Sequence, residues 1–235
     1  MPIRSLQDGA ESFNVTVLGP ERPSRVVLFG VGRGGDPERH LPLLEALAER
    51  GCVVAAPHFA RLPSPIPTAA DLRLRARRMR LALDAVDAAG LPVAGVGHSL
   101  GGTLLLALAG AQLWTLTGEG LAVTPLGRRL DRLALLAPAT DFFRGPGALD
   151  QVQTPILAWT GTADVIVTPE QVRLLERALA PRVPVETRVI DGAGHFSFMN
   201  VPPPHTNETL PEREAFLANL ATEVGRFVTG SAGRC

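Results

Sequence analysis

A serine in a glycine-bounded turn is the residue of this sequence with the clearest capacity for chemistry. Ser99 stands in the run Gly97-His98-Ser99-Leu100-Gly101, between an apolar stretch, residues 93–96, and a longer apolar stretch, residues 103–113. A strand, a sharp turn and a helix in this order are what a nucleophile elbow requires, because small residues two positions either side of the serine let the chain reverse without collision. The amino-terminal end of the helix would then face negative charge developing on a substrate oxygen.

A serine hydroxyl becomes an effective nucleophile when a base takes its proton and an acid orients that base. Two later loops supply these residue types. Asp164 follows the apolar stretch 156–160, and His195 lies between Gly194 and Phe196 after the stretch 185–190. Both loops come after the carboxyl ends of predicted strands, where the ligand sites of open α/β sheets lie. We therefore predict nucleophilic catalysis by Ser99, with His195 as base and Asp164 as acid.

Other residues compete for two of these roles. Asp141 follows the apolar stretch 133–136 and is an alternative acid, although Asp164 sits in a Gly-x-x-Asp turn that closes straight off a strand. Asp191 is interpreted as a turn residue, because its nearness to His195 in sequence does not aim its side chain at the imidazole. His98 lies inside the elbow and is interpreted as a pocket residue rather than the base.

Short apolar runs recur along the chain and predict the strands that position these loops. From the third run onward they alternate with helical segments, which is typical of a mostly parallel sheet covered by helices on both faces; the first would form an antiparallel edge. The runs are residues 13–18, 26–29, 53–56, 93–96, 133–136, 156–160 and 185–190, with residues 3–7 as a further edge candidate. We expect one α/β domain over residues 1–235.

The helix predicted after Thr68 carries both an apolar stripe and a cluster of arginines. The stripe is Leu72, Ala76, Met79, Leu83 and Val86. Spacings of three and four place these side chains on one buried face. We interpret the cluster, Arg73, Arg75, Arg77, Arg78 and Arg80, as a solvated face without a function of its own.

Composition narrows the class of ligand. Lys plus Arg (23) balance Asp plus Glu (23) over 235 residues, so no global charge indicates nucleic acid or an anionic membrane as partner. The chain contains no paired Cys-x-x-Cys, no His-Glu-x-x-His, no P-loop and no complete dinucleotide fingerprint, and we expect no metal and no cofactor. Neither a signal-peptide core nor an apolar run of spanning length is present, so we expect a cytoplasmic protein that binds a small molecule.

With elbow, acid turn and histidine loop in this order, residues 26–228 resemble the α/β-hydrolase family. The resemblance implies an α/β-hydrolase fold with a mostly parallel sheet of seven or eight strands. Within the family, the chain looks most like the small serine esterases around dienelactone hydrolase-like proteins, acetylhydrolases and polyester hydrolases. Too few residues separate the stretch 133–136 from Ile156 for a helical insertion, so we expect no large cap domain.

The resemblance also assigns an oxyanion hole. In these relatives a Ser-His-Gly-x-Gly-Gly loop follows the strand that matches residues 26–29, and here it becomes Gly30-Val31-Gly32-Arg33-Gly34-Gly35. By that match the backbone amides of Arg33 and Leu100 hold the oxyanion, while Val31 replaces the usual histidine. Two readings of the Arg33 side chain stay open: it lies in solvent, or it turns inward and binds an acidic group of the substrate.

The expected activity is hydrolysis of a carboxylic ester of a small molecule through an acyl-enzyme on Ser99. Aromatic side chains in and beside strands more often pack in the core, and we expect one or two of those near the predicted loops to line the pocket. The candidates are Phe142, Phe143, Trp159, Phe196 and Phe198. A thioesterase or a peptidase would use the same three side chains. A non-catalytic ligand-binding protein of this fold is the alternative from another functional class.

Overall fold

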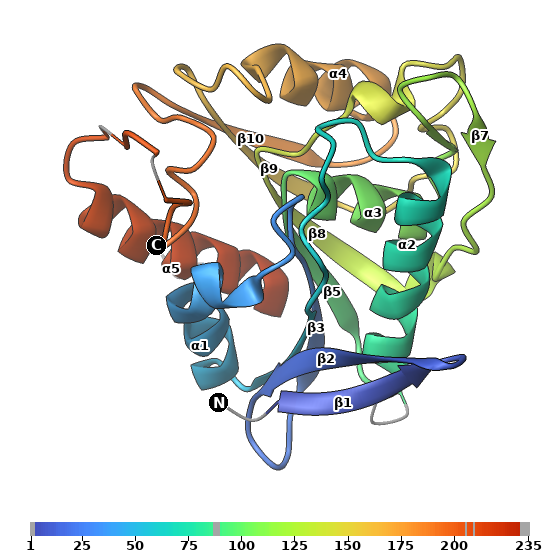
Figure 1. Cartoon of the computed structure of the whole chain (residues 1–235). Coiled ribbons are helices and arrows are strands. Elements are labelled where there is room, and N and C mark those ends of the chain that lie inside the picture. The colour runs from blue at the N-terminus through green and yellow to red at the C-terminus, as the bar shows by residue number, and fades with distance from the viewer. Residues whose placement is uncertain (1–2, 87–89, 205, 209, 231–235) are drawn as a thin grey trace.

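We describe the chain from a computed structural model, which covers residues 3–86, 90–204, 206–208 and 210–230. Over these residues, eight strands form one twisted sheet in the order β1-β2-β4-β3-β5-β8-β9-β10 (Figure 1). The strands are β1 (Ile3–Asp8), β2 (Glu11–Leu18), β3 (Arg25–Gly30), β4 (Cys52–Pro57), β5 (Val93–His98), β8 (Leu130–Leu136), β9 (Ile156–Gly161) and β10 (Val185–Ile190). A small hairpin, β6 (Leu113–Trp114) and β7 (Gly120–Leu121), stands apart from this sheet.

Strand direction follows the predicted pattern. Strands β3, β4, β5, β8, β9 and β10 pair in parallel, whereas β1 and β2 form the antiparallel edge. Every one of the apolar runs expected to form a strand does so, including the edge candidate at residues 3–7. The mostly parallel sheet is therefore as predicted, and its eight strands lie within the seven or eight that the resemblance implied.

Helices cover both faces of the sheet. In Figure 1, α1 (Leu41–Glu49) and α5 (Arg213–Thr229) lie together on one side, opposite α2 (Ala69–Asp84), α3 (Leu100–Leu108) and α4 (Pro169–Leu179). Alternate residues of β3 feed the two cores, with Val26 and Leu28 on the α2–α3 side and Val27 and Phe29 on the α1–α5 side. This alternation is the period of two expected of a strand buried on both faces.

The loops that follow β3 and β5 lie side by side but lead to helices on opposite faces of the sheet. The two strands are neighbours, yet β3 continues through α1 to β4 on one side, while β5 continues through α3 toward β8 on the other. Loops that leave adjacent parallel strands toward opposite faces open a crevice between them. The elbow after β5 and the glycine-rich loop after β3 both border this crevice.

Helix α2 departs from the prediction in its arginines. A capping box of Thr68 and Asp71 begins the helix, and the apolar stripe packs against the sheet as expected. However, Arg75 and Arg78 are buried, so the interpretation of the whole cluster as a solvated face is wrong for these two residues. Arg78 forms ion pairs with Asp8 and Glu11 of the edge hairpin, and Arg75 bonds to backbone carbonyls.

No large insertion covers the carboxyl end of the sheet. Residues 137–155, between β8 and β9, hold only the short 3-10 turn η3 (Asp141–Phe143) as regular structure. The other 3-10 turns are η1 (Pro37–His40) and η2 (Gly127–Arg129). Within the described residues, no helix combines the length and the apolar character that crossing a membrane would need.

Candidate active site

Ser99 occupies a strained backbone position at the end of β5. Its φ of 55° and ψ of −123° lie outside the regions that a non-glycine residue prefers, as expected of a serine on a tight strand-to-helix turn. The glycines around it permit the turn. A Cβ on Gly101 would lie 1.9 Å from the Gly30 carbonyl oxygen, and one on Gly97 would lie 2.9 Å from the Gly101 carbonyl carbon. Both contacts are with backbone, so only glycine fits.

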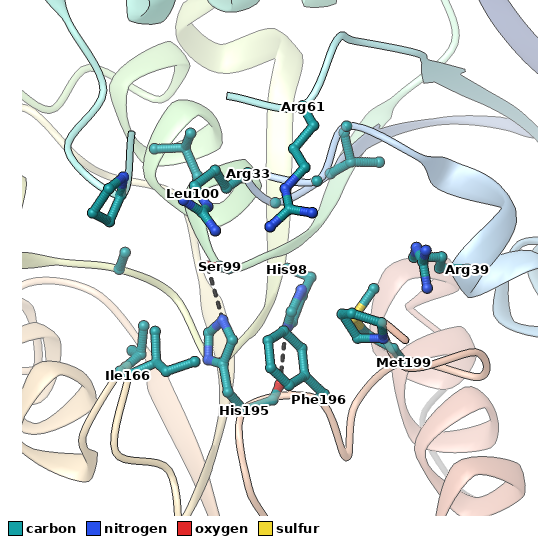
Figure 2. Close-up of a pocket in the computed structure, with 18 of the residues that line it drawn as sticks. Arg33, Arg39, Arg61, His98, Ser99, Leu100, Ile166, His195, Phe196 and Met199 are labelled. Carbon is teal, nitrogen blue, oxygen red and sulfur yellow. Dashed lines mark hydrogen bonds between the residues drawn. The ribbon is translucent and has the colours of Figure 1, made fainter. Parts of the chain in front are cut away.

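Ser99, His195 and Asp164 form one chain of hydrogen bonds. His195 Nε2 lies 3.0 Å from Ser99 Oγ, and His195 Nδ1 lies 2.8 Å from Asp164 Oδ2 (Figure 2 draws the first). The other carboxylate oxygen of Asp164 accepts from the amides of Ile166 and Val167 at 2.8 and 2.7 Å. The carboxylate therefore accepts three hydrogen bonds, which hold its orientation. An ionised Asp164 requires the proton of His195 to reside on Nδ1, which leaves Nε2 free to accept from the serine hydroxyl.

The loop that carries His195 is tied to the loop that carries Asp164. The Ala163 amide donates to the Ala193 carbonyl at 3.0 Å, and a Cβ on Gly161 would lie 2.0 Å from that same oxygen. On the other side, buried Ser197 accepts from the Gly194 amide at 2.8 Å. The first bond joins the two loops and the second holds the turn around His195, so the proposed acid and the proposed base share one rigid frame.

Two further histidines stack behind His195. The ring centroids of His40 and His98 are 5.3 Å apart, and those of His98 and His195 are 4.8 Å apart. Burial lowers the pKa of His40 to about 3 and holds the pKa of His98 well below its usual value, so both rings stay neutral. His98 Nε2 donates to the backbone carbonyl of His195 at 3.0 Å (Figure 2). His98 therefore supports the proposed base through its backbone.

A cavity of about 600 Å³ opens beside Ser99. Its wall includes Val31, Arg33 and Leu100 on the side of the glycine-rich loop and the elbow. Leu100 is the first residue of α3, so its amide has no partner within the helix. The predicted oxyanion amides thus belong to residues that border the same space as the serine.

Comparisons with known proteins point to one fold. No model of a protein family matches this sequence, and no curated protein matches it. Among solved structures, the native esterase 2 of Thermogutta terrifontis superposes with a TM-score of 0.69 at 18% identity, over 99% of this chain and 94% of that one. The dienelactone hydrolase of Anabaena variabilis superposes with a TM-score of 0.68 at 19% identity, over 97% of this chain and 96% of that one. The chain has the α/β-hydrolase fold.

In this α/β-hydrolase fold, three of the pocket candidates line the cavity and the others do not. His98, Phe142 and Phe196 border it. Phe143 and Trp159 do not border it, because Phe143 lies in the same buried core as Leu104 of α3 and Trp159 packs against Phe216 of α5. Phe198 is fully buried in the same core as Trp159. A period-two strand sends alternate side chains to opposite faces, so position next to a catalytic loop does not by itself place a side chain in the pocket.

The competing acids do not bond to His195. Asp141 accepts from the Arg144 guanidinium at 2.6 and 2.8 Å, and Asp191 accepts from the Thr162 hydroxyl at 2.9 Å, so both carboxylates have partners other than His195. Among the described residues, no three His, Cys, Asp or Glu side chains gather in a way that could hold a metal ion. The hydrogen bond to His195 thus favours Asp164 over both alternatives.

Arg61 of the cavity wall and Arg75 are residues near the site that the sequence did not indicate. Arg75 contacts the loop after β3. Its guanidinium donates to the carbonyls of Gly32 and Arg33 at 2.8 and 3.1 Å, in the loop predicted to hold the oxyanion. An arginine on a helix 42 residues further along the chain gives no local signal of such a contact. Burial of a cation without a carboxylate partner is the feature that marks it in the structure.

We predict that Gly101→Ala will strongly destabilise the protein. The added Cβ would press on the backbone of Gly30, which cannot rotate away, and should cost about 3 kcal/mol of the free energy of unfolding or more. Chemical denaturation followed by circular dichroism measures this. Gly34→Ala is the matched control, because a Cβ there meets nothing within 4 Å, and it should shift stability by less than about 0.5 kcal/mol. Equal midpoints for the two variants would contradict the prediction.

Proposed function

We propose that this protein is a serine hydrolase that cleaves a carboxylic ester of a small molecule through an acyl-enzyme on Ser99. The observation that carries the proposal is the hydrogen-bonded series Ser99, His195 and Asp164 at the wall of a cavity of about 600 Å³. The cavity is of the size that small-molecule sites usually have. Solved structures of the same fold include an esterase and a dienelactone hydrolase, which supports ester cleavage as the chemistry.

The first half of the reaction forms the acyl-enzyme. Ser99 Oγ attacks the ester carbonyl carbon while His195 Nε2 takes the hydroxyl proton, and Asp164 stabilises the imidazolium that results. The carbonyl oxygen becomes an oxyanion, which accepts from the backbone amides of Arg33 and Leu100. When this tetrahedral intermediate collapses, the bond between the carbonyl carbon and the alcohol oxygen breaks. The alcohol oxygen takes from His195 the proton that came from Ser99, and the alcohol leaves.

The second half releases the acid. Water replaces the alcohol, His195 takes a proton from it, and the resulting hydroxide adds to the acyl carbon in the same oxyanion hole. When the second intermediate collapses, Ser99 Oγ leaves and recovers its proton from His195. Water must therefore reach Ser99 in the acyl-enzyme, which a cavity without a helical cap permits.

Two arginines favour a negatively charged substrate. Arg33 and Arg61 border the cavity, and Figure 2 shows both guanidinium groups turned toward the space above Ser99. Neither forms a hydrogen bond or ion pair with any described residue. The carboxylates at the cavity wall are already paired, Asp36 with Arg39 and Asp141 with Arg144. We therefore assign to the site an ester that carries a carboxylate a few carbons from the scissile carbonyl.

Removal of the nucleophile tests the mechanism. Ser99→Ala should lower kcat on 4-nitrophenyl butyrate by at least about 10⁴-fold, because no other group can form the acyl-enzyme. A fluorophosphonate probe should label the wild-type protein once per chain and should leave the variant unlabelled. An organophosphate is an apt reagent, since the Thermogutta terrifontis esterase has been obtained phosphorylated by paraoxon. Wild-type turnover by folded Ser99→Ala protein would refute the proposal, and an unreactive Ser99 would favour the non-catalytic alternative.

The acid is tested by a matched pair of variants. Asp164→Asn should lower kcat by roughly 10³- to 10⁴-fold, because an amide at this position favours the tautomer of His195 with its proton on Nε2. Asp141→Asn removes a carboxylate at the cavity wall that bonds Arg144 instead, and its kcat should stay within about threefold of wild type. Steady-state kinetics on one ester compares the two, and the reverse order of effects would transfer the role to Asp141.

The charge preference is tested with two esters that differ only in charge. Wild-type kcat/KM should be about tenfold higher for mono(4-nitrophenyl) adipate than for its neutral methyl ester. Arg61→Gln should reduce this ratio to near one. Arg128 is an exposed residue of η2, which precedes β8 and does not border the cavity, so Arg128→Gln should leave the ratio unchanged. The ratio should also fall as salt is added. A wild-type ratio near one would remove the anionic substrate class and leave the esterase proposal intact.

A further inference from the structure

The burial of Arg75 is unusual in this protein. The residue lies in the middle of α2 and is 1% exposed, and its guanidinium forms no ion pair with a described carboxylate. Its donors go to three backbone carbonyls, those of Gly32 at 2.8 Å, Arg33 at 3.1 Å and Ala60 at 2.8 Å. The guanidinium also stacks on the Phe59 ring at 4.8 Å. Burial lowers its pKa to about 10, so the group stays charged at neutral pH.

The neighbouring Arg78 shows what an ordinary buried arginine looks like here. Arg78 is 8% exposed and contacts the carboxylates of Asp8 and Glu11, which compensate its charge. Arg75 has only carbonyl dipoles, and an apolar side chain of similar volume would avoid the cost of desolvating a cation. Packing alone therefore does not account for a guanidinium at this position.

The carbonyl of Gly32 belongs to the same peptide group as the amide of Arg33. A peptide group is planar and trans, so its C=O and N–H point in opposite directions. Arg75 holds the Gly32 oxygen on the α2 side, and the Gly35 amide donates to the same oxygen at 3.1 Å. The Arg33 N–H must then point away from α2.

Ser99 lies beside this peptide group. A Cβ on Gly32 would come within 3.3 Å of Ser99 Cβ, so the peptide group that begins at Gly32 borders the nucleophile. The Arg33 amide donates to no backbone or side-chain acceptor among the described residues. An unpaired donor beside a nucleophile is available to an oxygen of the substrate.

We propose that Arg75 is a positioning residue for the oxyanion hole. By holding the Gly32 carbonyl, it fixes the Gly32–Arg33 peptide so that the Arg33 amide faces the substrate oxygen at Ser99. The bond to the Arg33 carbonyl fixes the next peptide as well. A cation on the carbonyl also polarises the shared peptide group and strengthens the amide as a donor. This role rests on the proposed esterase function.

The test compares two buried arginines of the same helix. Arg75→Met should lower kcat on 4-nitrophenyl butyrate by about 100-fold with KM within about twofold, since loss of one oxyanion donor acts on the transition state. Arg75→Lys keeps the charge but lacks the planar fork, so it should fall between Arg75→Met and wild type. Arg78→Met loses a buried guanidinium away from the loop and should keep kcat within about threefold.

A second readout separates positioning from general loosening of the fold. An alkyl trifluoromethyl ketone forms a tetrahedral adduct with a reactive serine and so places an oxyanion in the hole. Its inhibition constant should rise in proportion to the loss of kcat/KM across the Arg75 variants, whereas the affinity for butyramide should not change. All rates are normalised to the folded fraction from thermal melts, and Arg75→Lys serves as the test if Arg75→Met does not fold.

The possible outcomes distinguish failure of the Arg75 role from failure of the proposed esterase function. Folded Arg75→Met with kcat and ketone affinity within about threefold of wild type would overturn the positioning role, while Ser99-dependent esterase activity would still stand. If Arg75→Met does not fold, the same result for Arg75→Lys would overturn it. Equal losses in the Arg75 and Arg78 variants would also overturn it, because they would reflect stability. A wild-type protein without Ser99-dependent turnover would overturn both the esterase function and the role of Arg75.

Discussion

The site depends on a close contact between two backbones where β3 and β5 lie side by side. Gly30 ends β3, Gly101 stands in the first turn of α3, and a Cβ on Gly101 would come within 1.9 Å of the Gly30 oxygen. Because neither residue has a side chain, the elbow can press against the loop that follows β3. The strained φ of Ser99 persists because the surrounding strands hold it. The proposed nucleophile and the proposed oxyanion hole, which lie on separate loops, thereby become one site.

The titratable side chains buried near this contact are stabilised in different ways. Asp164 receives two amide donors besides His195, whereas burial keeps His98 neutral. Arg75 stays charged and is compensated by carbonyl dipoles. All 23 basic residues of the chain are arginines, whose planar group presents several donors at once. One such side chain can donate to carbonyls of two loops at once, as Arg75 does. The ammonium of a lysine lacks the planar fork needed to reach the same set of carbonyls.

Sequence reasoning reached the strands, their mostly parallel pairing and the loops of Ser99, Asp164 and His195, because each of these signals is local. It failed for Arg75 and Arg78, whose partners lie 43 and 70 residues away in the chain. Phe143 and Trp159 border predicted loops but pack in the core, which is the more frequent role of an aromatic side chain beside a strand. Which side of an element a residue faces near its end depends on the exact boundary, and single sequences define boundaries poorly.

A formal net charge of zero for the whole chain does not determine the charge of the cavity wall. Charges separated by more than about 10 Å are largely screened at 0.1 M salt, so a ligand responds to the local arrangement and not to the sum over the chain. At the cavity wall, Asp36 and Asp141 are each paired with an arginine three residues later in the chain. Arg33 and Arg61 come from different loops, and their guanidinium groups meet no such partner within the part of the chain that the structure describes. Pairing of neighbours in sequence thus neutralises the carboxylates and leaves two cations facing Ser99, so a balanced composition and a positive site are compatible.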